Sequence, residues 1–192
     1  MSRRFWGYAA TAAFASGAFF AYLGGAPYVG EAIFGMGAAE LGLFLGAPAV
    51  GYMTGNGLSG RFSVRVGINR MVLWGTWLNA AGVALSAALF LTGFGTALSF
   101  FGFMTFVGLG NGMTIPNATS GALSVRPHLA ATASGLSGAI MLGGGAGLSA
   151  LAGALLTVET GAMPLLWLML VTAILAIAAI CSVIWRERQL GL

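Results

Sequence analysis

Long apolar segments separated by short connections dominate the pattern of this sequence. Six segments occur, at about residues 7–29, 39–60, 70–93, 97–119, 130–155 and 162–185. Each can cross the hydrocarbon core of a bilayer, which takes about 20 residues of helix. Helices are expected because backbone groups in lipid must form their hydrogen bonds within the segment. The pattern therefore predicts an all-α membrane protein in which residues 1–192 form one bundle of six transmembrane helices.

The charged residues divide between alternate connections. The eight basic residues are all arginines and fall on one set of connections and the two termini: Arg3, Arg4, Arg61, Arg65, Arg70, Arg126, Arg186 and Arg188. The intervening connections hold Glu31, Glu40 and Glu159 and no arginine. Because basic connections stay in the cytoplasm, both termini are predicted to lie inside.

Composition narrows the classes of function. The chain is 58% hydrophobic and only 6% charged, whereas a soluble domain carries about 25% charged residues. Its arginines are spread over short connections, as topology signals and lipid contacts are, so no nucleic-acid partner is expected. Cys181 is the only cysteine, which excludes an internal disulfide and a cysteine-based metal site. We predict no metal and no cofactor.

Polar side chains enter the membrane mainly in the fourth segment, at Asn111, Thr114 and Asn117. Steps of three residues on a helix keep them within one arc of roughly 120°. Pro116 removes a backbone hydrogen bond and favours a kink beside that arc. Such an arc suits a substrate cavity, and hydrogen bonding between helices is the alternative. Both interpretations stay open for Asn111 and Thr114, while the structural role is favoured for Asn117.

The first segment ends in aromatic residues beside a break, Gly24-Gly25-Ala26-Pro27. Ring faces here could form a wall for an apolar or cationic ligand. Tyr22 is the candidate, because it lies deeper in the segment than Tyr28. The alternative is that these rings belong to the core and the membrane interface.

Glycine is dense in the second, fourth and fifth segments and absent from the sixth. The spacing G-x-x-x-G allows close approach of helix backbones. It occurs in the pairs Gly42 and Gly46, Gly51 and Gly55, Gly108 and Gly112, and Gly143 and Gly147. The run 143–145 is also a candidate flexing point, since glycine weakens a helix. The sixth segment, without glycine, is expected to be peripheral and to face lipid.

An enzymatic alternative is a six-helix intramembrane serine protease. Two tetrapeptides match its G-x-S-G form, around Ser59 and Ser137. Such a protease needs a histidine within hydrogen-bond reach of the serine. The only histidine, His128, lies in a predicted connection. The protease is therefore the remote alternative: we predict no enzyme and assign no catalytic residue.

The connection between the second and third segments carries a distinctive motif. Asn56, Arg61, Arg65, Gly67 and Arg70 follow the spacing N-x-x-x-x-R-x-x-x-R-x-G-x-x-R. Arginines in such a turn can donate to the carbonyl ends of helices, so the loop could hold two helices in one state and release them in another. This spacing resembles the loop signature of the major facilitator superfamily.

Two further stretches are similar to one branch of that superfamily, the Bcr/CflA-type multidrug efflux transporters. The first runs from Gly108 through Pro116-Asn117-Ala118-Thr119 to Gly135. The second is Phe20-Ala21-Tyr22 with Pro27-Tyr28-Val29 and Glu31. The resemblance implies the carboxy-terminal half of a twelve-helix transporter in a bacterial inner membrane. It also implies that the first and fourth helices face the substrate cavity. The second and fifth would meet the other half, and the third and sixth would face lipid.

The leading prediction is half of a proton-coupled efflux antiporter for small amphipathic drugs or metabolites, embedded in the lipid bilayer. Its partner would be an amino-terminal six-helix half, which carries the coupling carboxylate in this family, or a second copy of the chain. A dimer of two copies would lack that acid and act as a facilitator or weak uniporter. The alternative class is a membrane assembly or chaperone-like factor, or a remnant half-transporter that no longer transports.

Overall fold

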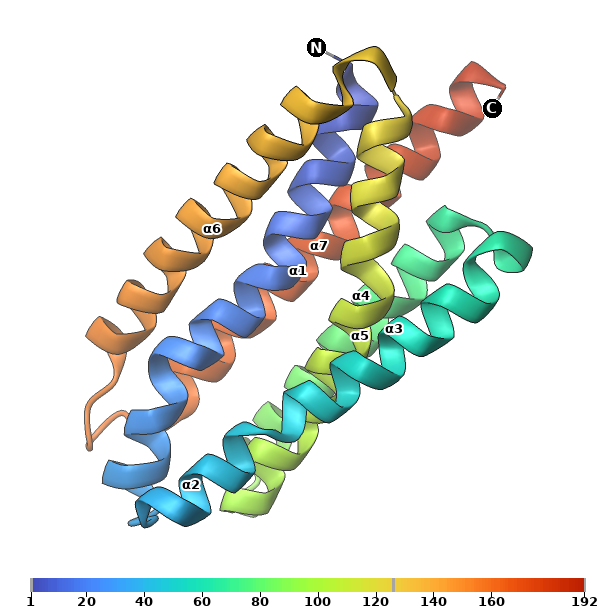
Figure 1. The fold of residues 1–192 in the computed structure, drawn as a ribbon. Helices are drawn as coiled ribbons and strands as arrows, with labels where there is room; N and C mark the ends of the chain where they lie inside the picture. Colours follow the sequence, from blue (N-terminus) through green and yellow to red (C-terminus); the bar gives the residue numbers. More distant parts are fainter. Residues whose placement is uncertain (1, 126, 192) are drawn as a thin grey trace.

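The computed structural model describes residues 2–125 and 127–191, and every regular element in them is helical (Figure 1). The elements are α1 (Arg3–Tyr28), the π-helical η1 (Val29–Ile33), α2 (Ala38–Leu45), α3 (Ala47–Val66), α4 (Ile68–Leu91), α5 (Ala97–Ser124), the 3₁₀ turn η2 (Pro127–Leu129), α6 (Ala130–Leu155) and α7 (Met163–Leu190). The all-α prediction is confirmed. Arg126, predicted on a basic connection, lies outside the described residues.

Five helical segments are long and apolar enough to cross a membrane: residues 3–33, α4, α5, residues 127–155 and α7. These support a multi-pass membrane protein. The second predicted segment differs, because it is broken into α2 and α3 and is not among the five. Glycines, hydroxyl groups, one amide and two arginines lower the mean hydropathy of α3.

The break lies at Gly46, which ends α2 and precedes α3. Pro48 stands in the first turn of α3, where the missing N–H of proline costs no helical hydrogen bond. A Cβ atom added at Gly42 would meet nothing within 4 Å. The packing predicted for Gly42 and Gly46 as one helical pair is therefore wrong, since the pair spans a helix end.

Helices α1 and α5 occupy the centre of the bundle. Helix α1 contacts α5, α6 and α7, and α5 contacts α3 and α4. Helix α4 also packs on α7, which closes the group α1, α4, α5 and α7. Figure 1 shows α6 along one edge beside α1 and α3 along another beside α5.

The expectation that the sixth predicted segment is the peripheral one needs correction. This segment, α7, buries a row of large side chains against its neighbours, among them Leu165, Met169 and Ile180. Helix α6 is the more exposed, with 11% of its most apolar stretch buried against 33% for α7. The reason is the position in the bundle: α7 packs on both α1 and α4, whereas α6 packs mainly on α1 and leaves Leu142 and Leu151 exposed.

Two of the predicted glycine pairs lock α3 onto α5. A Cβ atom at Gly108 would lie 1.9 Å from the carbonyl oxygen of Pro48, and one at Gly51 would lie 2.0 Å from that of Thr105. Gly55 and Gly112 face the opposite backbone in the same way. The close approach that the spacing predicts for these pairs is confirmed.

The other residues predicted to form kinks or close helix contacts show neither clearly in the described residues. A Cβ atom at Gly143 or Gly147 would meet nothing within 4 Å, and α6 runs unbroken through both. Pro116 lies inside α5 without ending it. Pro27 lies near the end of α1, which continues for one residue and is followed by the π-helical η1.

The predicted arginine loop is mostly helix. Helix α3 continues to Val66, so Arg61 and Arg65 lie on its last two turns, and α4 begins at Ile68. Gly67 alone joins the two helices, at φ 92° and ψ 145°. Only glycine adopts this region without strain, which explains its place in the motif.

Replacing Gly67 with alanine is expected to destabilise the fold by about 1–3 kcal/mol through backbone strain alone, since a Cβ there meets no neighbour. The detergent concentration at half-unfolding, followed by circular dichroism, measures this. Gly60→Ala is the matched control, because Gly60 lies in α3 with open space around it. An equal effect of both changes would contradict the strain at Gly67.

Candidate functional site

A cavity of about 320 Å³ lies between α1, α3, α5 and α6. Its walls are mostly apolar, with hydroxyl groups from Ser16 and Tyr52 and an amide from Asn111. The full lining is Ser16, Phe19, Phe20, Pro48, Ala49, Tyr52, Gly108, Asn111, Ile115 and Met141. A largely apolar hollow with a few polar groups, between the helices of a bundle, is the usual form of a small-molecule site.

Asn111 belongs both to this cavity and to a buried polar contact. The Nδ2 of Asn79 donates to the Oδ1 of Asn111 over 3.0 Å and lies 3.3 Å from the carbonyl oxygen of Ala15. Asn79 and Asn111 are buried. The contact ties α4, α5 and α1 together beside the cavity and gives the Nδ2 of Asn79 and the Oδ1 of Asn111 a partner that lipid could not supply. The Oδ1 of Asn79 is buried and has no partner among the described residues.

The sequence interpretation missed Asn79. It is the only amide in the apolar stretch 71–93, and an amide at that depth must find a partner on another helix. The resemblance placed this helix toward lipid, whereas α4 buries one face against α5 and α7.

Thr114 and Asn117, the other polar candidates of α5, contact helices rather than the cavity. The hydroxyl of Thr114 lies 3.4 Å from the carbonyl oxygen of Val72 on α4. The Nδ2 of Asn117 donates to the hydroxyl of Ser59 on α3, over 2.7 Å. The polar arc of α5 is thus divided among its neighbours, and only Asn111 lines the hollow.

Tyr22 lies behind the cavity wall. Its side chain is fully buried among aromatic rings, with centroid distances of 6.4 Å to Phe19, 6.2 Å to Phe100 and 6.3 Å to Phe101. Of these rings, Phe19 lines the cavity. The hydroxyl of Tyr22 is buried and has no hydrogen-bond partner among the described residues. A ligand would reach Tyr22 only after Phe19 had moved.

The motif residues around Gly67 lie far along α3 and at the start of α4. Asn56 donates to the carbonyl oxygen of Tyr52 within its own helix. Arg61, Arg65 and Arg70 are exposed, and none forms an ion pair with another residue of the described ranges. Within residues 2–125 and 127–191 their guanidinium groups donate no hydrogen bond to a helix carbonyl, so the contacts to helix ends that the sequence suggested are not formed there.

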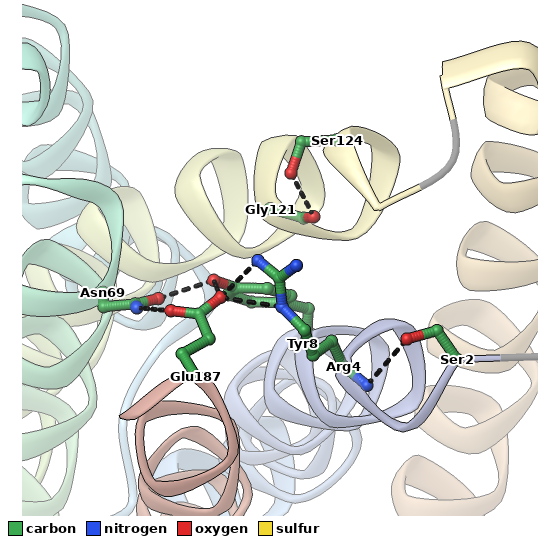
Figure 2. Close-up of polar contacts among 7 residues, drawn as sticks. All are labelled: Ser2, Arg4, Tyr8, Asn69, Gly121, Ser124 and Glu187. Atoms are coloured by element: carbon green, nitrogen blue, oxygen red, sulfur yellow. Dashed lines mark hydrogen bonds and ion pairs between the residues drawn. The ribbon is translucent and has the colours of Figure 1, made fainter. Parts of the chain in front are cut away.

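A second polar group, which we call the terminal cluster, consists of Arg4, Tyr8, Asn69 and Glu187 (Figure 2). The carboxylate of Glu187 accepts from Arg4, at 3.0 Å from Nε and 2.5 Å from Nη2. It also accepts from the amide of Asn69. The Tyr8 hydroxyl lies 2.6 Å from the Oδ1 of Asn69 and 3.0 Å from Glu187, and its single proton can serve either acceptor.

The terminal cluster gathers the start of α1, the start of α4 and the end of α7 at one end of the bundle. Glu31 follows α1 at the opposite end, and it is exposed. The division of charge along the sequence is therefore also a division between the two ends of the fold. Glu187 is not among the residues predicted from the sequence, although it is the one acid that lies with the basic connections and termini.

The protease residues are not brought together. The hydroxyl of Ser59 accepts from Asn117 and lies 3.2 Å from that of Ser63. Ser137 is buried without a partner in the described part of the chain. His128 is exposed in η2 and forms no hydrogen bond with either serine. Among the residues that the structure describes, no group of three or more His, Cys, Asp or Glu could hold a metal.

Comparisons of the chain with protein-family models, with curated proteins and with solved structures found no match.

Proposed function

We propose that the chain is one six-helix half of a major facilitator-type transporter, and that the cavity beside Asn111 forms one wall of its substrate site. The observation that carries the proposal is the position of this cavity. It lies between α3 and α6, two helices that carry exposed glycines with open space around them, such as Gly57 on α3 and Gly143 on α6.

The outer face of α3 mixes small and polar residues with exposed apolar side chains such as Met53 and Val64. Thr54, Gly57 and Gly60 are exposed, and the helix as a whole is not apolar enough to count as a membrane span. On α6 the exposed positions include Thr132, Gly143, Gly144 and Gly147. Small residues at these positions allow another helical bundle to approach closely, whereas they offer lipid little packing area. The α3 and α6 faces together are suited to a partner half, as the resemblance implies.

The course of the chain supports a sixth crossing. Helix α1 starts at the terminal cluster and leads to Glu31 at the opposite end, while α4 starts at Asn69, again within the cluster. The intervening α2 and α3 must therefore run the length of the bundle, as Figure 1 shows. With a partner half covering α3, these two helices supply the crossing that hydropathy alone does not identify.

Coupling to protons would come from the partner. No carboxylate lines the cavity, and the acids of the described residues lie toward the two ends of the bundle. The chain would thus bind part of an amphipathic drug or metabolite, and an amino-terminal half would carry the proton. Two copies alone would act as a facilitator, and the basic end of each would face the cytoplasm of a bacterial cell.

Efflux of ethidium, an amphipathic fluorescent cation, tests the proposal in cells that lack their own efflux pumps. We expect Asn111→Leu and Ile115→Trp to slow efflux about tenfold, the effect of about 1.4 kcal/mol of lost binding. The first removes the cavity amide and the second fills the hollow. The matched control, Ile174→Trp, lies on the exposed face of α7 and should leave efflux unchanged.

Tyr22→Phe refines the test, because it removes only an unpartnered hydroxyl and preserves the ring packing. Slower efflux with unchanged stability would place this hydroxyl in the substrate path. Protein abundance in the membrane is measured for every variant. Absence of efflux by the native chain, or equal efflux by the cavity variants and the control, would overturn the proposal. A stable partner without transport would instead identify an assembly factor.

A further inference from the structure

A groove of about 510 Å³ lies between α4 and α7 at the basic end of the bundle. Its walls combine arginines, neutral polar groups and apolar side chains: Asn69, Arg70, Leu73, Trp74, Ile184, Glu187 and Arg188. It is separate from the cavity of the proposed transport site, which α1, α3, α5 and α6 enclose. We propose that this groove binds an anionic phospholipid by its phosphate group.

The charge of the groove favours an anion. Arg70 and Arg188 lie on its two walls, and neither forms an ion pair within the described ranges. The one acid of the lining, Glu187, already accepts hydrogen bonds from Arg4 and Asn69 and is therefore compensated. Two arginines are left to attract a phosphate, and guanidinium groups match the geometry of phosphate oxygens.

The start of α4 adds a second attraction. This helix of 24 residues begins at Ile68 without a side-chain cap, and Asn69 and Arg70 of its first turn line the groove. The first backbone N–H groups of a helix have no partner within it and carry partial positive charge. Phosphate groups bind readily at such an end.

The apolar part of the groove distinguishes a lipid from a free ion. Leu73 and Trp74 follow Arg70 by about one helical turn, and Ile184 precedes Arg188 by one turn on the facing helix. These side chains extend along the membrane from the arginines and can contact acyl chains. Trp74 is half-exposed, as aromatic side chains at a membrane interface commonly are. A headgroup site with an apolar extension fits an anionic phospholipid.

This inference requires a membrane-embedded chain but not transport, so it can stand if the proposed function fails. The test uses the full chain in nanodiscs of phosphatidylcholine with a small fraction of phosphatidylglycerol whose acyl chains are brominated. Bromine quenches tryptophan at contact distance. The quenching of Trp74 is the part of the signal that Trp74→Phe removes. We expect it at a lower mole fraction of brominated phosphatidylglycerol than of brominated phosphatidylcholine.

The double variant Arg70→Gln and Arg188→Gln should require about tenfold more phosphatidylglycerol for the same quenching, since each arginine contributes to attraction of an anionic headgroup. The control double variant Arg61→Gln and Arg65→Gln changes charge equally on α3, outside the groove. It should behave as the native chain.

Competition by inorganic phosphate distinguishes a site for a phospholipid from a site for a free phosphate ion. Millimolar phosphate should not displace the brominated lipid. Displacement by phosphate would overturn the lipid assignment in favour of a free anion. An equal loss of Trp74 quenching in both double variants would show a general electrostatic effect and overturn the proposed site. Equal quenching by both lipids would show no headgroup selection and also overturn it.

Discussion

Replacing Gly108 with alanine is expected to separate α3 from α5 and to lower the free energy of unfolding by about 3 kcal/mol or more. The new Cβ would lie 1.9 Å from the carbonyl oxygen of Pro48. The obstacle is backbone, which cannot rotate aside as a side chain can. Because α3 supplies Pro48, Ala49 and Tyr52 to the cavity, its displacement would also remove one wall of the proposed transport site.

Unfolding in a mixture of mild and denaturing detergent, followed by circular dichroism, measures this effect. Gly143→Ala is the matched control, since it adds the same methyl group to a helix with nothing within 4 Å. Alanine favours helix over glycine by about 1 kcal/mol, so the control should be neutral or stabilising. Gly51→Ala should reproduce the damage from the other side of the contact. A Gly108 variant as stable as the control would contradict the close packing of α3 on α5.

Replacing Glu187 with alanine is expected to lower the free energy of unfolding by about 2 kcal/mol, the size of a hydrogen bond to a charged group. The change removes the acceptor shared by Arg4 and Asn69, and it leaves the guanidinium of Arg4 without a hydrogen-bond partner among the described residues. The side chains of Arg4 and Glu187 are 24% and 12% exposed. The loss is therefore larger than for an ion pair on an open surface.

The same detergent titration measures the loss, with Glu159→Ala as the control. Glu159 is exposed near the opposite end of the bundle and forms no ion pair in the described part of the chain. Its removal deletes the same charge and should change stability by less than about 0.5 kcal/mol. Equal effects would indicate that net charge, rather than the terminal cluster, controls stability. Glu187→Gln should recover part of the loss, because its amide oxygen can still accept from Arg4.

The sequence by itself determined the helical class, the approximate positions of five apolar helices and the division of charge between alternate connections. These features are local: an apolar run of sufficient length forms a membrane helix whatever its neighbours are. The close contact of Gly51 with α5 was also accessible, because small residues at a spacing of four form a smooth stripe on one helix.

The tertiary structure alone decided which polar groups meet. Asn79 and Asn111 are 32 positions apart, and Arg4 and Glu187 are 183 apart, so no local pattern pairs them. It also decided that α7 is better buried than α6, and that Thr114 and Asn117 turn to neighbouring helices while Asn111 reaches the cavity. A helical pattern identifies a face, but what that face contacts depends on how neighbouring helices are arranged around it. That arrangement is set by packing over the whole bundle.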